Sequence, residues 1–403
     1  MRLIQHIPVW GDPVDEGALA QLVNTLWSAP EAAGAALMAD HHLGYAVPIG
    51  GVVAYRDAVS PSGVGFDIGC GNKAVRLKCD PETVKRDIAK IMDEIVKRIS
   101  FGMGRNNGVV VEHPMFDKSD SRWDHEAVRS LKRMAQNQLG TVGGGNHYVD
   151  VMQDDLGDIW VGCHFGSRGL GHKTATWFLK KGGAKDGINA TPLVLSMHTL
   201  LGQEYVECMK LAGEYAYAGR DWVCAEVARI IGAEIVEEVH NHHNFAWQEN
   251  HRGENLWVVR KGATPAFPGQ RGFIGGSMGD PAYIVEGRAL AAYTAAKMEQ
   301  ALGFFSTVHG AGRAMSRTKA RGKTNRRTGE VISPGEISHE QMDKWLADEH
   351  VELRGGDLDE APQAYKRIEE VLAHHIRTVK IIHELRPLGV AMAGRDVIDH
   401  YKD

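Results

Sequence analysis

A short turn with an acid and a thiol offers the first metal-binding chemistry in the chain. Asp67 and Cys70 lie three residues apart in the segment Asp-Ile-Gly-Cys-Gly at 67–71. A carboxylate and a thiolate at this spacing can bind one metal ion or two adjacent ions. Together with imidazole, these ligands suit transition metals such as manganese, zinc, iron or cobalt. An isolated pair of this kind is more often a turn aspartate beside a buried cysteine.

Three histidines lie in settings that could complete such a site. His147 follows a glycine turn, His164 ends an apolar run before a second glycine turn, and His243 belongs to the histidine-rich segment 240–243. A single histidine is more often a hydrogen-bonded core or capping residue. Three of them beside turns or a helix end, together with the acid and the thiol, favour a metal centre. The spacing leaves open which histidine of 240–243 is the ligand.

His309 precedes three small residues and is the candidate nucleophile. Imidazole can attack phosphorus to form a phosphoramidate, and small neighbours let backbone N–H groups approach phosphate oxygens. Arg313 and Arg317 could offset charge on a phosphoryl group during transfer. The motif fits a histidine in a tight turn, with arginines that face solvent, about equally well. The basic stretch 313–327 likewise fits a solvated loop or a phosphate-contact arm.

Glycine turns are the elements that must position these side chains. The 47 glycines gather in short clusters, which permit positive φ and close approach of the backbone to a ligand. The clusters are 63–71, 140–145, 166–171, 269–279 and 310–312. Five such turns suggest one extensive site assembled from distant segments. None has the spacing of a P-loop or of a dinucleotide-binding motif after a strand, which argues against a familiar NTPase or Rossmann site.

Apolar periodicity predicts a mixture of helices and strands, and therefore an α+β fold with several sheet segments. The predicted helices are 15–28, 81–98, 125–139, 203–238, 287–302 and 364–385. The predicted strands are 51–55, 73–77, 159–164, 256–260 and 282–285. We find no internal repeat and no linker rich in proline and serine, so the pattern indicates one domain.

Composition narrows the class of protein. The 403 residues are 43% hydrophobic, enough for a substantial core, and the formal net charge is −5. A polyanion would therefore have to bind through local clusters or metal ions. Five scattered cysteines do not form the framework of a small secreted domain. Because no signal peptide and no run of about 18 apolar residues occurs, we expect a cytoplasmic protein that does not enter a membrane.

Taken together, these motifs closely resemble the RtcB family of RNA ligases. They occur in that family's order and span nearly the whole chain. The matching segments are 40–44, 67–71, 145–147, 164–169, 242–244, 260–263, 276–279, 309–313, 315–320 and 364–366. The resemblance implies a single RtcB-like domain, 1–403, with several β-sheet segments around a central dinuclear metal cleft.

The resemblance also implies a ligand set for two Mn²⁺ ions that share Cys70. Asp67, Cys70 and His147 would hold one ion, and Cys70, His164 and His243 the other. Such ions would neutralise and align the phosphates of a nucleotide and of an RNA end.

The implied reaction begins when His309 attacks the α-phosphate of GTP, which gives a histidine–GMP adduct. Guanylate passes to an RNA 3′-phosphate, and a 5′-hydroxyl displaces GMP to complete the join; a 2′,3′-cyclic phosphate is opened first. RNA repair or tRNA splicing is the implied setting, with archease as a candidate activating partner. The implied nucleotide contacts are Asn146, Asp150, Asn244, Gly275, Gly276, Ser277, Met278, Gly310, Ala311 and Gly312, and the implied phosphate or RNA contacts are Arg168, Arg313 and Arg317.

Departures from the family pattern concern the nucleotide. Met392 stands where the family has a lysine that recognises guanine, although Lys402 could substitute for it. Asp150 replaces a glutamate and is shorter by one methylene. Further departures are the helical stretch 287–302, Phe165 and Tyr45. The alternatives are a divergent paralogue with altered nucleotide preference, a two-metal cyclic-phosphate hydrolase or phosphodiesterase, and a non-catalytic RNA-binding protein; the presence of His309 argues against the last two.

Overall fold

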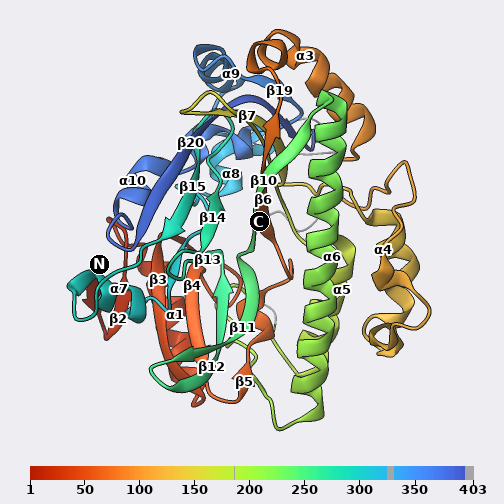
Figure 1. The fold of residues 1–403 in the computed structure, drawn as a ribbon. Coiled ribbons are helices and arrows are strands. Elements are labelled where there is room, and N and C mark those ends of the chain that lie inside the picture. Colours follow the sequence, from red (N-terminus) through yellow and green to blue (C-terminus); the bar gives the residue numbers. More distant parts are fainter. Residues whose placement is uncertain (186, 325–330, 395–403) are drawn as a thin grey trace.

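The computed structural model describes residues 1–185, 187–324 and 331–394 and has mixed helices and sheets (Figure 1). The predicted α+β class is confirmed. One sheet follows the order β1 (Arg2–Ile4), β2 (Ile7–Val9), β3 (Ala32–His42), β4 (Ile49–Tyr55), β12 (Glu254–Lys261) and β11 (Asn244–His251). The second follows β10 (Glu234–His242), β6 (Gly71–Lys78), β8 (Ile159–Phe165), β7 (Tyr148–Asp154), β20 (Val379–Met392), β15 (Ala282–Gly287) and β14 (Arg271–Ile274), with β19 (Glu352–Arg354) beside β20.

The second sheet curls until its two end strands meet. Asn241 of β10 donates through Nδ2 to the carbonyl of Arg271 at 2.9 Å and accepts from the amide of Phe273 at 3.1 Å, both in β14. This seam makes the sheet a nearly closed barrel. Each of its seven successive strands contributes to one apolar cluster that fills the interior, as in other small barrels. The cluster is Ala74, Met152, Trp160, Val239, Phe273, Ala282, Ile284 and Leu385.

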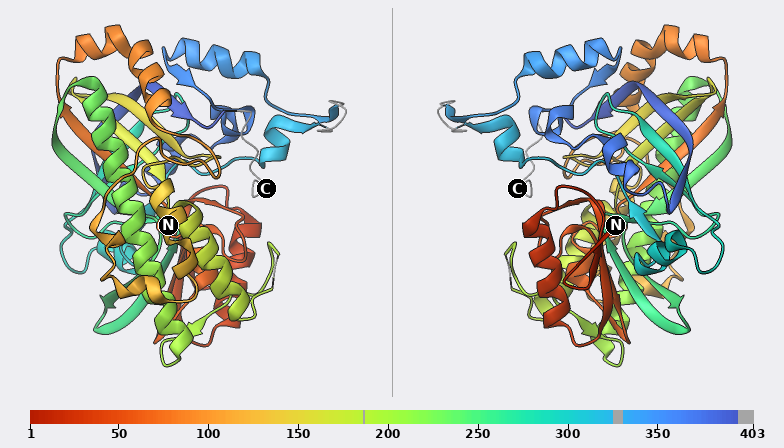
Figure 2. Two further views of the ribbon diagram at one scale, coloured as in Figure 1. Left: turned by 90° about the vertical axis from the view of Figure 1, so that its right-hand side faces the viewer. Right: turned by 90° about the vertical axis from the view of Figure 1, so that its left-hand side faces the viewer.

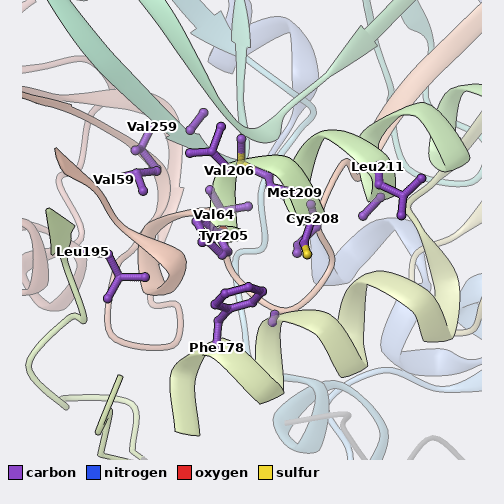
Figure 3. Packing of buried hydrophobic residues seen from close by; sticks show 14 of the residues in the cluster. Val59, Val64, Phe178, Leu195, Tyr205, Val206, Cys208, Met209, Leu211 and Val259 are labelled. Atoms are coloured by element: carbon purple, nitrogen blue, oxygen red, sulfur yellow. The ribbon is translucent and has the colours of Figure 1, made fainter. Parts of the chain in front are cut away.

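Helices cover the outside of the barrel and the first sheet. The long helix α6 (Leu200–Ile231) runs beside β6, β8 and β10, and α3 (Pro81–Arg98) lies against β20 (Figure 1). The helix α5 (Arg168–Lys181) packs on α6, and its Phe178 ring meets the Tyr205 ring edge-on, with centroids 5.3 Å apart (Figure 3). The helix α1 (Glu16–Ser28) covers β3. The apolar faces of α1, α3 and α6 are therefore buried against a sheet, and that of α5 is buried against other helices.

Shorter elements complete the described chain. The remaining helices are α2 (Pro61–Val64), α4 (Lys132–Gln138), α7 (Ala295–Leu302), α8 (Arg317–Arg321), α9 (His339–Asp348) and α10 (Ile368–Ala373). The 3-10 turns are η1 (Pro114–Phe116), η2 (Ser121–Asp124), η3 (Arg129–Leu131), η4 (Leu358–Glu360) and η5 (Pro362–Ala364). The pairs β5 (Ala58–Val59) with β9 (Leu195–Ser196), β13 (Ala263–Pro265) with β16 (Ser306–Val308), and β17 (Gly322–Thr324) with β18 (Val331–Pro334) are small sheets.

The helices predicted at 15–28 and 81–98 are confirmed, as are all five predicted strands. The helix predicted at 125–139 is shorter, because a turn in which His125 Nδ1 accepts from the Ala127 amide at 3.1 Å precedes η3 and α4. The prediction for 287–302 holds only from 295, since Gly287 still belongs to β15.

Two helix predictions overran into strands. The helix predicted at 203–238 ends at Ile231, where Gly232 adopts φ 77°, and β10 follows. The prediction for 364–385 is largely wrong, because only α10 is helical and β20 begins at Val379. The β-branched Ile381 and Ile382 favour the strand there.

Within the described ranges, no helix is both long and apolar enough to cross a membrane. Arg326, Arg327 and Lys402, which belong to the basic stretch and the C-terminal tail, lie outside the described residues.

Candidate metal and phosphoryl-transfer site

Antiparallel pairing gathers the predicted metal ligands at one end of the barrel. The turn 67–70 leads into β6, whose first residue, Gly71, pairs with His242 of β10 and with Phe165 of β8. Tyr148, the first residue of β7, pairs with His164. The start of β6, the end of β8, the start of β7 and the end of β10 therefore meet in space, although they are far apart in sequence.

Cys70 lies at the centre of this cluster. Its Sγ is 3.6 Å from His147 Nε2 and 3.5 Å from His164 Nε2, and His147 Nε2 is 3.1 Å from Asp67 Oδ2. The backbone amide of His243 donates to the Cys70 carbonyl at 2.8 Å. The imidazoles of His164 and His243 have centroids 4.9 Å apart.

The side chains form two groups, each able to hold a metal ion. Asp67, Cys70 and His147 make one group, and Cys70, His164 and His243 the other, with all ligand atoms of a group within 4.8 Å of one another. Cys70 belongs to both. This is the arrangement that the sequence resemblance implies for two ions.

Burial sets the protonation of the cluster. It lowers the pKa of His164 and of His243 well below the ordinary value, which keeps both imidazoles in the neutral, metal-binding form. It also raises the pKa of the Cys70 thiol, so the thiolate needs a nearby cation. Burial raises the pKa of Asp67, but the hydrogen bond and charge of His147 outweigh it and bring that pKa to about 2. The donor set therefore suits a metal cation.

The structure shows which histidine of the segment 240–243 can be a metal ligand, a question that sequence spacing left open. His240 Nδ1 lies 3.3 Å from Asp221, and His242 Nδ1 lies 2.9 Å from the Gly69 carbonyl. Both also contact the buried guanidinium of Arg220. Only His243 of the three reaches the group around Cys70 among the described residues.

Asn72 links the metal cluster to the candidate nucleophile. Its Oδ1 accepts from His164 Nδ1 at 2.6 Å, which fixes the ring and turns Nε2 toward Cys70. Its Nδ2 donates to the His309 carbonyl at 3.1 Å. The Nδ1 atoms of His147 and His243 are buried and have no hydrogen-bond partner within the described structure.

His309 follows β16 and is held by Asp40 of β3. The Nδ1 of His309 donates to Asp40 Oδ2 at 2.6 Å, and the His309 amide donates to the same oxygen at 3.0 Å. Burial raises the pKa of Asp40, but the charge and hydrogen bonds of His309 bring it below the ordinary value. Asp40 is thus an anion at neutral pH, and it leaves His309 Nε2 as the nitrogen available for attack. The His309 and His243 centroids are 4.7 Å apart.

A cavity of about 610 Å³ connects these groups with the predicted nucleotide contacts. Every predicted site residue except Arg168 lines it. The lining includes Asp67, Cys70, Asn146, His147, Asp150, His164, His243, Asn244, Gly275, Gly276, Ser277, Met278, His309, Gly310, Ala311, Gly312, Arg313 and Arg317.

Arg168 lies behind the cluster. Its Nη2 donates to the Gly102 carbonyl at 2.9 Å, and its Nε donates to Thr141 Oγ1 at 3.2 Å. A Cβ on Gly143 would approach His147 Nδ1 to 2.0 Å and Arg168 Nη1 to 2.6 Å, so only glycine fits between them. Arg168 therefore supports the His147 loop from behind.

Arg313 and Arg317 line the cavity but also contact buried acids. Arg313 donates through Nη2 to the Asp359 carbonyl at 2.7 Å and lies over the Tyr365 ring. Arg317 Nη1 lies 3.2 Å from Asp359 Oδ2 and also pairs with Glu360. The buried Glu360 carboxylate pairs with both guanidinium groups and holds them at the cavity wall.

The predicted nucleotide contacts have mixed surroundings. Asn244 Oδ1 accepts from the Gly262 amide at 2.7 Å, and Ser277 donates to Asp280 Oδ2 at 2.6 Å, so both side chains also support turns. Asp150 Oδ1 is buried without a partner in the described structure, and burial raises the pKa of Asp150 well above the ordinary value. Met392, which pairs with Tyr148 across β20 and β7, lines the same cavity.

The sequence did not predict the residues that hold the candidate ligands, the nucleophile and the arginines in place. Asp40 carried a signal, because it opens the segment 40–44 that matched the family, yet no role was assigned to it. Asn72 follows Cys70 by two residues but is an unremarkable strand residue in the sequence. Asp359 and Glu360 lie in a 3-10 turn without any motif. Their roles depend on contacts between distant segments.

Known proteins resemble the chain along nearly all of its length. A family profile described as "tRNA-splicing ligase RtcB" matches residues 21–393. The chain is 30% identical to "RNA-splicing ligase RtcB" of Escherichia coli, with 94% of this chain and 95% of that protein covered. It is 32% identical to "tRNA-splicing ligase RtcB" of Archaeoglobus fulgidus, with 88% and 86% covered. An Entamoeba dispar protein, "RNA-splicing ligase RtcB homolog 1", is 29% identical, with 88% and 78% covered.

Proposed function

The chain belongs to the RtcB family, and from this premise we propose that it is a GTP- and manganese-dependent RNA ligase. It joins RNA 3′-phosphate or 2′,3′-cyclic phosphate ends to 5′-hydroxyl ends in RNA repair or tRNA splicing. Relatives named RNA-splicing ligase support the ligase activity. Residues 1–403 would form one RtcB-like domain around a dinuclear cleft, with archease as a candidate activator.

The observation that carries this proposal is His309, oriented by Asp40 at the wall of the cavity that contains the cysteine–histidine cluster. Because Nδ1 of His309 donates to Asp40, Nε2 keeps its lone pair. Nε2 attacks the α-phosphorus of GTP, a P–N bond forms, and pyrophosphate leaves. Asp40 stabilises the positive charge that the ring acquires.

The next two steps use the same site. An oxygen of the RNA 3′-phosphate attacks the phosphorus of the adduct, and the P–N bond to His309 breaks. A 5′-hydroxyl then attacks the activated 3′-phosphate, which forms the 3′,5′ bond and releases GMP. Arg313 and Arg317 would face the phosphates, and the turns 275–278 and 310–312 would supply backbone N–H groups.

The two groups that share Cys70 fit the manganese ions of this proposal. Asp67 and His147 would complete one set of ligands, and His164 and His243 the other. When bound, such ions supply neutralising charge and polarise phosphoryl oxygens. The buried, unpartnered Nδ1 of His243 and the buried thiol of Cys70 support this assignment, since each gains from a cation nearby.

Labelling tests the ligase proposal. The protein is incubated with Mn²⁺ and α-labelled GTP, and acid-labile label on the chain is measured. We expect label on the parent protein and on His198→Ala, a control whose side chain is 79% exposed, but none on His309→Ala or Cys70→Ser. Absence of label with either GTP or ATP, together with hydrolysis of cyclic phosphate ends, would support the two-metal phosphodiesterase instead.

Labelling with ATP instead of GTP tests which nucleobase the protein prefers. Asp150 carries a buried oxygen without a partner, and Met392 adds an apolar surface where the family has a lysine. The surroundings of Asp150 favour a neutral carboxyl, which can donate as well as accept a hydrogen bond. Label from ATP in place of GTP would identify a ligase with altered nucleotide preference.

A further inference from the structure

Three exposed apolar side chains line the cavity near the metal cluster. Leu43, Tyr45 and Ile188 are 45%, 44% and 41% exposed, and all three line the same cavity as Cys70. Phe66, which directly precedes Asp67, lines it as well. Apolar side chains left in water at the edge of a polar site are typical of a ligand contact surface. We call these four residues the apolar shelf.

The shelf is built from three distant segments that hydrogen bonds tie together. Gln21 Nε2 donates to the Gly44 and Ile188 carbonyls, each at 2.6 Å. The amide of Ala46 donates to the Ile188 carbonyl at 3.1 Å, and Lys261 Nζ donates to the Tyr45 carbonyl at 2.7 Å. Figure 2 shows the segment after α5 lying against the N-terminal elements, as these bonds require. A backbone fixed in this way loses little freedom when a ligand binds.

Aromatic contacts fix the rings as well. Phe66 stacks on His172 of α5, with centroids 5.3 Å apart and planes at 29°. Tyr45 meets Phe66 edge-on, with centroids 6.1 Å apart and planes at 85°. Phe66 also packs on the main apolar core. The shelf is therefore a preformed aromatic surface.

We propose that the apolar shelf stacks the terminal nucleobase of a single-stranded RNA end; this rests on the proposed ligase function. Phe66 adjoins Asp67, so the shelf continues directly from the metal cluster. A nucleotide whose phosphate lies at that cluster has its base within reach of the shelf. The turns 275–278 and 310–312 take the activating nucleotide elsewhere in the same cavity, which leaves the shelf for the RNA.

The chemistry of the shelf matches that occupant. Single-stranded RNA is commonly bound by aromatic side chains that stack on unpaired bases. Leu43 and Ile188 add apolar contact at the ring edges. Stacking accepts any base, because every base has a π-face, so the shelf predicts ligation of ends that carry each of the four bases.

Fluorescence of terminal 2-aminopurine tests the proposal directly. One RNA carries it beside a 3′-phosphate, and a second carries it at a 5′-hydroxyl end, so the two arms identify which end occupies the shelf. With Mn²⁺ and the full chain, we expect quenching in at least one arm. Tyr45→Phe should retain the quenching, and Tyr45→Ala should abolish it and weaken binding roughly tenfold, as expected when one stacked base is lost.

Controls separate a local effect from unfolding. Leu200→Ala removes a side chain that is 70% exposed and does not line the cavity, and should bind like the parent protein. An abasic terminal nucleotide should weaken binding to the parent protein but not further weaken binding to Tyr45→Ala, since both changes remove the same contact. The proposal would be overturned if the abasic nucleotide and Tyr45→Ala weakened binding additively, or if neither RNA showed quenching.

Failure of the base-stacking proposal can be distinguished from failure of the ligase proposal. Formation of the histidine adduct uses GTP but no RNA, so labelled protein without base quenching rejects the shelf and keeps the ligase. Quenching that depends on Tyr45 in a protein that never takes label supports the shelf and rejects the ligase.

Discussion

At the scale of single residues, Asp40 decides what His309 can do. Asp40 is completely buried and accepts two hydrogen bonds from His309, one from the ring and one from the backbone. An anion in this position selects the tautomer whose Nε2 is free, as the buried aspartate does in hydrolase triads. The carboxylate also stabilises the charged ring after attack.

Asp40→Asn should therefore lower the rate of histidine labelling by about 100-fold or more, the range attributed to base and orientation effects. The amide keeps the shape but no longer carries the charge. Initial rates of labelling with α-labelled GTP measure the effect. Asp57→Asn, at a side chain that is 76% exposed, is the matched control. Equal rates for Asp40→Asn and the control would refute this role.

The sequence predicted the candidate metal ligands and the nucleophile better than the residues that orient them. Cys70, His147, His164 and His309 stand out because they lie beside glycine turns, and His243 because it lies in a histidine-rich segment. The structure brings all five to one cavity. The partner of His309 lies 269 residues away in sequence. No local pattern records such a pair, so the positioning residues emerged only from the fold.

At the scale of elements, the end of α6 shows why boundaries were mispredicted. Apolar residues continue at helical spacing beyond Ile231, but Gly232 takes φ 77° and caps the helix. The chain then reverses into β10, which carries the residues leading to His243. A helix extended to 238 would have moved that ligand away from the barrel, so the glycine is part of the construction of the site.

Gly232→Ala should destabilise the protein by about 1 kcal/mol, because an L-residue pays a steric cost in the left-handed region. Among the described residues beyond its two chain neighbours, no atom lies within 4 Å of the added Cβ, so the loss reflects the local backbone conformation. Gly108→Ala is the control, since its Cβ also meets open space and its φ lies outside the left-handed region. Free energies of unfolding in urea measure both changes; a cost at both positions would contradict the explanation.

The barrel seam gives a second test at this scale. Asn241 is 6% exposed and joins β10 to β14 through two hydrogen bonds. Asn241→Ala leaves an amide and a carbonyl unpaired and should lower the free energy of unfolding by about 2 kcal/mol. Asn255→Ala, which removes an exposed hydrogen bond to Asn250, should have little effect. Equal losses of unfolding free energy in the two variants would show that the seam bonds stabilise the protein no more than an exposed surface bond does.

At the scale of the whole molecule, the metal cluster couples elements that are distant in sequence. Its ligands come from the loop before β6, the residue before β7, the end of β8 and the residue after β10. Of the strands beside these ligands, β6 and β8 were predicted from short apolar runs, whereas β10 was predicted as part of a helix. Their order in the sheet was not predictable from local pattern, since it depends on pairing between strands more than 80 residues apart, such as β6 and β8.

Manganese should therefore stabilise the folded chain as a whole. An ion that binds only the native state adds about 2.7 kcal/mol at a hundredfold excess over its dissociation constant. We expect Mn²⁺ to raise the unfolding temperature and a chelator to reverse the change. Cys70→Ser should lose most of the shift, because the shared thiolate serves both groups, whereas Cys79→Ser at the end of β6 should keep it. The same shift in both variants would mean that Mn²⁺ acts elsewhere than at Cys70.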